Sequence, residues 1–220
     1  MRKIMVVVLF LFCLSGCTGS FVEAPTIKIS PPRTEAFTGV TKPILRVRSY
    51  SWVGEHTSAY SSGTAFVIMR NKTLYLVTAY HVVSDSTVVE FLTHDNKPIL
   101  VNISKVFLLS NMDAALMQIE SISAKIEPLK LGVYKQGGKV KAIGYPKEGD
   151  YTEKEGHNYS TKVYTTAKLE LGMSGGPVLD DEGNVIGINS AKVINDHTVK
   201  GIFSRLEDVF SRLDQVPSDK

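Results

Sequence analysis

The stretch Gly172-Met173-Ser174-Gly175-Gly176-Pro177 carries the most information in this chain. It places a serine in a glycine-rich turn, where the backbone can approach a ligand closely and adopt unusual dihedral angles. The N–H groups of Gly172 and Ser174 would face the oxygen that becomes negative when a hydroxyl attacks a carbonyl, and each such donor is worth roughly 10²–10³ in rate. Most glycine turns that contain a serine catalyse nothing, so this one needs partners elsewhere in the chain.

Two upstream segments place further reactive residues at the ends of apolar strands. Thr78-Ala79-Tyr80-His81-Val82-Val83 follows the apolar run 74–77, and Asn111-Met112-Asp113 precedes the run 114–119. Taken alone, His81 could equally be a buried core histidine with its hydrogen bonds satisfied. Asp113 alone is more often a turn or cap residue. Each segment is therefore ambiguous by itself.

Together, the three segments resemble the trypsin/chymotrypsin-fold serine peptidases, and within them the HtrA-type bacterial proteases. The family's T-A-x-H-V motif is matched by Thr78 to Val82, D-x-A-L by Asp113 to Leu116, and G-x-S-G-G-P by Gly172 to Pro177. The order His, Asp, Ser is also that of the family. The resemblance extends over about residues 44–209. Weaker matches cover Ser62–Val67, Ala142–Pro146 and Val185–Ala191.

The resemblance implies a catalytic triad. His81 would accept the proton of Ser174 and return it to the leaving amine, and Asp113 would hold the imidazole in the required tautomer. The N–H groups of Gly172 and Ser174 would form the oxyanion hole. We therefore expect a serine endopeptidase that cleaves protein or peptide substrates through an acyl-enzyme. The alternatives are a chaperone-like or binding lipoprotein on the same fold with little proteolysis, and a processing protease with a single protein target.

The specificity pocket can be placed only by analogy. Lys168 lies six residues before Ser174, at the family's pocket-base position, where a lysine would favour acidic P1 residues. If the loop shifts by one residue, Lys168 faces solvent and this preference disappears. The strand that contains Asn189, Ser190 and Ala191 is expected to bind substrate beside the nucleophile.

Regulation by proteolytic activation is not expected. Met173 stands where digestive trypsins carry an aspartate that pairs with a freed N-terminus, and methionine cannot make that ion pair. If the activity is regulated, we expect ordering of the loop 168–172 to be the means. The chain ends at Lys220, soon after the expected terminal helix, so we expect no PDZ domain.

The remaining pattern is that of an all-β protein. The family fold implies two six-stranded antiparallel β-barrels, at about 44–122 and 123–204, followed by a C-terminal α-helix within a protease domain 44–216. Short runs rich in β-branched and aromatic residues predict strands. These runs are Ile44–Val53, Thr64–Met69, Leu74–Thr78, Thr87–Leu92, Ala114–Ile119, Lys139–Ile143 and Val185–Asn189.

The C-terminal helix has its own signals. Ser204-Arg205-Leu206-Glu207 fits a capping box, which would make Ser204 the N-cap. Leu206, Val209, Phe210 and Leu213 then recur at helical spacing, which indicates a stripe packed against the core.

The N-terminus reads as an export signal. Arg2 and Lys3 precede the apolar run 4–14, which is too short to span a bilayer, and Leu14-Ser15-Gly16-Cys17 resembles the lipobox of bacterial lipoproteins. We therefore expect a signal peptide at 1–16, a lipidated (palmitate-bearing) Cys17, and a Pro- and Ser-rich tether over 17–43, although an ordinary secretory signal is the alternative. The protein would be extracytoplasmic and anchored to a bacterial membrane. By resemblance to Gram-negative lipoproteins, the outer membrane is somewhat favoured if the cell has one, because Thr18 rather than an aspartate follows Cys17.

Composition narrows the other classes of function. The net charge is only +3, and basic residues form no stripe with interleaved aromatics, so nucleic acid is not an expected partner. No metal-binding or phosphate-binding motif is present, and no cofactor is expected. The four other histidines lie in polar, turn-like segments: His56, His94, His157 and His197.

Overall fold

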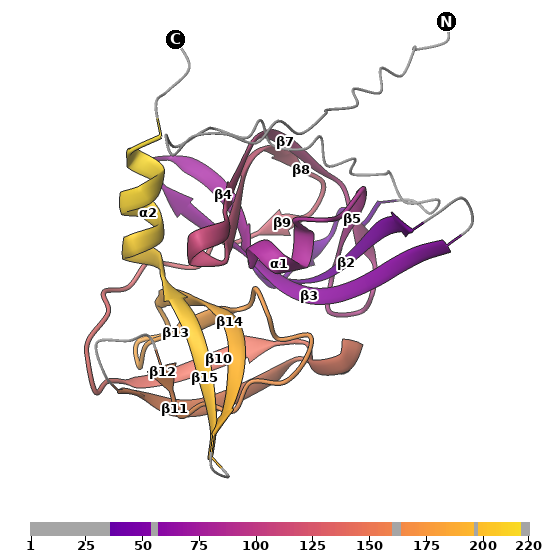
Figure 1. The fold of residues 1–220 in the computed structure, drawn as a ribbon. Helices are drawn as coiled ribbons and strands as arrows, with labels where there is room; N and C mark the ends of the chain where they lie inside the picture. Colours follow the sequence, from indigo (N-terminus) through magenta and orange to yellow (C-terminus); the bar gives the residue numbers. More distant parts are fainter. Residues whose placement is uncertain (1–35, 54–56, 160–163, 196–197, 217–220) are drawn as a thin grey trace, which may run out of the picture.

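A computed structural model of the chain describes residues 36–53, 57–159, 164–195 and 198–216. The N-terminal half of this region forms a curled antiparallel sheet of seven strands, the indigo to magenta part of Figure 1. Its order is β6 (Pro98–Ile99), β5 (Val88–Leu92), β2 (Ile44–Val53), β3 (Thr57–Arg70), β4 (Thr73–Thr78), β8 (Ala114–Ile122) and β7 (Val101–Leu109).

The C-terminal half closes into a six-stranded antiparallel barrel, which lies below the first sheet in Figure 1. Closure removes the free sheet edges, so this half needs no covering elements to protect them. Around the barrel the order is β10 (Lys139–Gly144), β11 (Thr152–Tyr159), β12 (Tyr164–Thr165), β15 (Thr198–Arg205), β14 (Val185–Asn195) and β13 (Pro177–Leu179).

The main hydrophobic core joins the two halves. Phe66 and Val77 from the first sheet belong to one buried cluster with Ile143 and Ile188 from the barrel. Helix α2 (Leu206–Asp214) adds its apolar stripe to the same cluster, and this confirms the packing role predicted from its spacing. The four stripe residues are Leu206, Val209, Phe210 and Leu213.

The predicted capping box is wrong. Ser204 belongs to β15, its hydroxyl donates to the carbonyl of Met112, and the helix begins after Arg205 with no side-chain cap. The capping-box pattern does not form because β15 continues through Ser204, which pairs with Ile188 of β14.

The end of the expected tether is also structured. β1 (Val40–Thr41) pairs in parallel with β9 (Lys125–Ile126), and the N–H of Phe37 donates to the carbonyl of Pro98 at 2.8 Å. Residues 37–41 therefore contact the first half of the fold. The signal peptide, Cys17 and the rest of the tether lie outside the described residues.

Two curled antiparallel β halves followed by a C-terminal helix form a chymotrypsin-like fold, and this confirms the predicted fold class. The seventh strand of the first sheet is an addition to the predicted six. In the described part of the chain, none of the helices has both the length and the apolar character needed to cross a membrane.

Candidate active site

The three motif residues come from loops at the contact between the two halves. His81 lies in the short helix α1 (Tyr80–Val83), directly after β4. Asp113 lies between the turn η1 (Ser110–Met112) and β8, and its backbone is left-handed, with φ of 46°. An aspartate tolerates this conformation better than most residues do. Ser174 lies in the glycine turn that precedes β13.

His81 and Asp113 are in direct contact. Nδ1 of His81 lies 2.9 Å from each carboxylate oxygen of Asp113, and the backbone N–H of His81 donates to Oδ1 at 3.0 Å. An ionised carboxylate can only accept hydrogen bonds, so Nδ1 carries the proton in this pair. A neutral imidazole then leaves Nε2 unprotonated and able to accept a proton.

Ser190 connects Asp113 to the nucleophile motif. Its hydroxyl donates to Oδ2 of Asp113, and its backbone carbonyl accepts a hydrogen bond from Oγ of Ser174 at 3.2 Å. Burial would raise the pKa of Asp113, but the hydrogen bonds from His81 and Ser190 outweigh it, so the pKa lies below its ordinary value. The carboxylate is therefore held in its charged form.

The hydroxyl of Ser174 is oriented toward Ser190 rather than toward His81. Among the residues that the structure describes, Oγ of Ser174 donates to the Ser190 carbonyl and makes no hydrogen bond to the imidazole. Hydrogen bonds between catalytic groups are often long or misaligned when no substrate is present.

The glycines of the turn are required by space as well as by conformation. Gly172 has φ of +93°, and a Cβ atom there would lie 2.5 Å from the carbonyl oxygen of Tyr145. Gly175 has φ of +82°, and a Cβ atom there would lie 2.2 Å from the carbonyl oxygen of Thr64. In the described part of the chain, the N–H groups of Gly172 and Ser174 donate to no backbone carbonyl. Both donors remain available to a ligand.

Thr64, which the sequence reasoning placed only in a supporting strand, holds this turn from the first sheet. It is fully buried, and its hydroxyl donates to the carbonyl of Gly172 at 2.8 Å and accepts the N–H of Tyr145 at 3.1 Å. Its backbone N–H donates to the carbonyl of Ser174 at 2.8 Å. The match of Ser62–Val67 to the family was the only signal that could have pointed to it.

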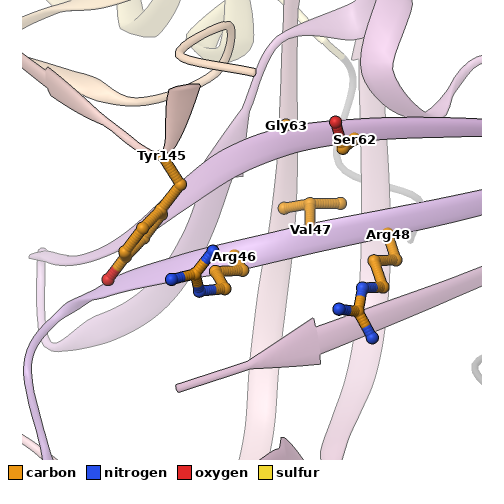
Figure 2. A pocket seen from close by; sticks show the side chains of 6 residues that line it. All are labelled: Arg46, Val47, Arg48, Ser62, Gly63 and Tyr145. Atoms are coloured by element: carbon orange, nitrogen blue, oxygen red, sulfur yellow. The ribbon is translucent and has the colours of Figure 1, made fainter. Parts of the chain in front are cut away.

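Tyr145 reaches from the barrel onto the first sheet, as Figure 2 shows. Its hydroxyl donates to the carbonyl of Ile44 at 3.0 Å, and the guanidinium of Arg46 lies 4.4 Å from its ring centroid. Tyr145 and Arg46 line a small pocket together with Gly63 of β3. This contact fixes the loop after β10 against β2 and β3.

The side chain of Lys168 is exposed, whereas the flanking Ala167 and Leu169 are buried at 0% and 5% exposure. A Cβ atom on Gly201 would lie 3.0 Å from Cγ of Leu169, so the Leu169 side chain lies close to β15. Of the two arrangements considered for this loop, exposure of Lys168 is the one expected if the loop is shifted by one residue.

The three residues predicted to bind substrate, Asn189, Ser190 and Ala191, differ in their surroundings. Asn189 is fully buried, and its amide donates to the carbonyls of Ile143 and Met173, so its side chain supports the turn from inside. Ser190 contacts Asp113 and Ser174 as described above, and Ala191 is exposed. Met173 is fully buried and packs with Leu169.

Two further observations concern the other candidate groups. His94 and His157 are exposed, and His56 and His197 lie outside the described residues. Within the described ranges, no three His, Cys, Asp or Glu side chains come together in a way that could hold a metal ion.

Comparisons with known proteins agree with this geometry. Residues 63–188 match the family described as trypsin-like peptidase domain. The chain is 27% identical over 192 residues to "Protease Do-like 1, chloroplastic" of Arabidopsis thaliana, covering 77% of this chain and 42% of that protein. It is 29% identical over 175 residues to a "Probable periplasmic serine endoprotease DegP-like" of Marinomonas sp., covering 72% of this chain and 36% of that protein.

A third relative, "Serine protease Do-like HtrA" of Lactobacillus helveticus, is 32% identical over 153 residues, with 61% of this chain and 36% of that protein covered. The chain thus spans about two fifths or less of the length of these relatives. Among solved structures, the active form of the Rv3671c protease from M. tuberculosis superposes with a TM-score of 0.65 at 20% identity, covering 88% of this chain and 96% of that chain. This last similarity concerns the fold.

Proposed function

Since the chain belongs to the trypsin-like peptidase domain family, we propose that it is a serine endopeptidase that cleaves protein substrates through an acyl-enzyme. One observation carries the proposal. A continuous series of hydrogen bonds runs from Ser174 through Ser190 and Asp113 to His81, so the three motif residues lie within one site although they are far apart in sequence.

The chemistry assigned to each residue follows from its contacts. Asp113 keeps the Nδ1 proton of His81, so Nε2 can take the proton of Ser174 as the hydroxyl attacks the scissile carbonyl. The N–H groups of Gly172 and Ser174 would then donate to the oxyanion of the tetrahedral intermediate. His81 returns the proton to the leaving amine, and water hydrolyses the acyl-enzyme by the same steps.

The substrate side chain at P1 is proposed to be neutral and apolar. Leu169 faces Gly201 with Ala167 and Met173 nearby, and all four are uncharged. An acidic side chain beside them would lose its hydration without gaining a cationic partner, since the Lys168 side chain is exposed. A peptide library should therefore show cleavage after Val, Ala or Leu. Cleavage confined to Asp or Glu would refute this pocket.

The assignment is tested by removing the nucleophile. Ser174→Ala should lower kcat by about 10⁶ and abolish labelling by a fluorophosphonate probe. Ser211→Ala, an exposed serine of α2, is the matched control and should label and cleave like the wild type. Labelling that survives Ser174→Ala would contradict the proposed nucleophile. A wild type that neither labels nor digests unfolded casein would favour the binding or chaperone-like alternative.

We also propose that the protein works outside the cytoplasm, anchored through a lipid on Cys17. The support is the lipobox-like Leu14-Ser15-Gly16-Cys17 and the relatives named as periplasmic and chloroplastic. Cys17→Ser should abolish incorporation of labelled palmitate and release the protein from the membrane fraction, while Cys13→Ser should change neither. Continued palmitate incorporation in Cys17→Ser would refute the anchor.

A further inference from the structure

The peptide bond between Leu171 and Gly172 carries one donor of the proposed oxyanion hole, the N–H of Gly172. The N–H of Met173 donates to the carbonyl of Glu170 at 3.1 Å, which closes a four-residue turn over 170–173. Gly172, the third residue, has φ of +93°, as a type II turn requires. The type I alternative has φ near −90° there and turns the central peptide over. Glycine accepts either sign of φ, so this residue alone does not select between the two.

The two turn types differ in what they present to a ligand. Turning over the central peptide exchanges the positions of the Gly172 N–H and the Leu171 carbonyl. The type II form leaves the Gly172 N–H available, whereas the type I form would place a carbonyl oxygen where the oxyanion must be bound. One hydrogen bond identifies the form that is held here: the backbone N–H of Lys147 donates to the carbonyl of Leu171 at 2.7 Å.

Lys147 itself is held in an unusual conformation by the first sheet. It lies in the turn η2 (Pro146–Glu148) with φ of 49° and ψ of 37°, the left-handed region that costs a non-glycine residue roughly 1–2 kcal/mol. The turn is closed by the Gly149 N–H, which donates to the carbonyl of Pro146 at 2.7 Å. Tyr145, the preceding residue, is fixed by its hydrogen bonds to Ile44 and Thr64. The side chain of Lys147 is exposed, so its backbone is the part that contacts the site.

We infer that Lys147 is a positioning residue, whose backbone N–H holds the Leu171–Gly172 peptide in the orientation that keeps the oxyanion hole open. This inference rests on the proposed peptidase function. It explains why a lysine is kept in a left-handed turn beside a site that its side chain does not enter. Loss of this one N–H should impair transition-state binding far more than substrate binding, because the ground-state contacts of a substrate do not depend on it.

The test removes the N–H of Lys147 and keeps the turn around it. Replacing Lys147 by its α-hydroxy acid analogue converts the amide to an ester, and should lower kcat for a peptide amide roughly 10²-fold, the scale of losing one oxyanion donor, with KM changed less than about threefold. The Ki of a peptide aldehyde, whose hemiacetal oxygen needs the hole, should rise in parallel. Lys147→Gly keeps the N–H and suits the left-handed turn, and should restore kcat to within about threefold of wild type.

Two further variants separate positioning from general damage. Lys72→Pro disrupts another left-handed lysine, in the β3–β4 turn, and should lower stability without changing kcat per folded molecule. Lys147→Pro also deletes the N–H, but proline fixes φ at about −65° where this position has φ of 49°, so that variant disturbs the turn as well. An ester variant with wild-type kcat would overturn the inference. A wild type without peptidase activity would instead overturn the proposed function.

Discussion

The hydroxyl of Thr64 offers a direct test of how the first sheet supports the glycine turn. The side chain is fully buried, and its oxygen pairs two backbone groups of the second half, the carbonyl of Gly172 and the N–H of Tyr145. Thr64→Val keeps the shape of the side chain and removes both hydrogen bonds. Neither backbone group is then paired, and each unpaired buried group costs about 1–3 kcal/mol.

The expected loss of stability follows from these terms. Two unpaired groups cost about 2–6 kcal/mol, and the added methyl group returns about 1 kcal/mol of burial, so the free energy of unfolding should fall by about 1–5 kcal/mol. With a urea m-value of about 2–3 kcal/mol/M, the unfolding midpoint should shift by about 1 M. Circular dichroism during urea titration measures this shift, and kcat should fall as well because the carbonyl that is released belongs to Gly172.

Thr64→Ser is the matched control for this prediction. It retains the hydroxyl and loses one methyl group, which costs about 1 kcal/mol. If Thr64→Val unfolds at no lower a urea concentration than Thr64→Ser, the hydroxyl does not hold the turn and the reasoning above is refuted.

Three other predictions concern titratable groups. Ser190→Ala removes the hydroxyl that donates to Asp113 and leaves the backbone carbonyl that accepts from Ser174. The value of kcat/KM should fall about tenfold, and the acid limb of its pH profile should move to higher pH. An unchanged profile would exclude a role for this hydroxyl in holding Asp113. The pKa of Asp113 is lowered in the folded state, so below about pH 4 the unfolded chain binds more protons than the folded chain and the free energy of unfolding falls as the pH drops. The slope of the free energy of unfolding against pH, measured by urea unfolding from pH 5 to 2, should be shallower in Asp113→Asn. Burial raises the pKa of Tyr145 to about 12, so between pH 10 and 12 the unfolded chain loses a proton that the folded chain keeps. The free energy of unfolding should therefore fall by up to about 2.7 kcal/mol over this range. Tyr145→Phe should lack this part of the loss, and equal alkaline slopes in the two proteins would refute the prediction.

The parts of the site that were predictable from the sequence are those whose chemistry is local. The peptide segments around His81, Asp113 and Ser174 each carry their reactive residue and its turn within a few positions, so the resemblance could be recognised segment by segment. Thr64 could not be recognised in the same way. Its function lies in contacts to Gly172 and Tyr145, more than 80 residues away, and nothing in its own neighbourhood shows them.

Two of the strands that the sequence reasoning missed have a physical reason in common. β11 (Thr152–Tyr159) reads as a polar segment, with Glu153 and Glu155 exposed on the outside of the barrel. β15 ends in Ser204 and Arg205, which locally resemble a helix start. Both become strands because their neighbours in the closed barrel supply hydrogen bonds, through β10 for the first and β14 for the second. Pairing partners of this kind are not visible in a short window of sequence.

The orientation of Lys168 shows how burial energies decide which side chains of a loop face inward. Between residues 167 and 169, successive side chains alternate between buried and exposed, so a shift of one residue exchanges which of them is buried. Burying the leucine gains about 1.5–3 kcal/mol, whereas burying an ammonium without a partner costs several kcal/mol. Leu169 and Ala167 flank the lysine, so the arrangement with both inside and Lys168 outside is favoured by both contributions. Counting back from Ser174 carries no information of this kind.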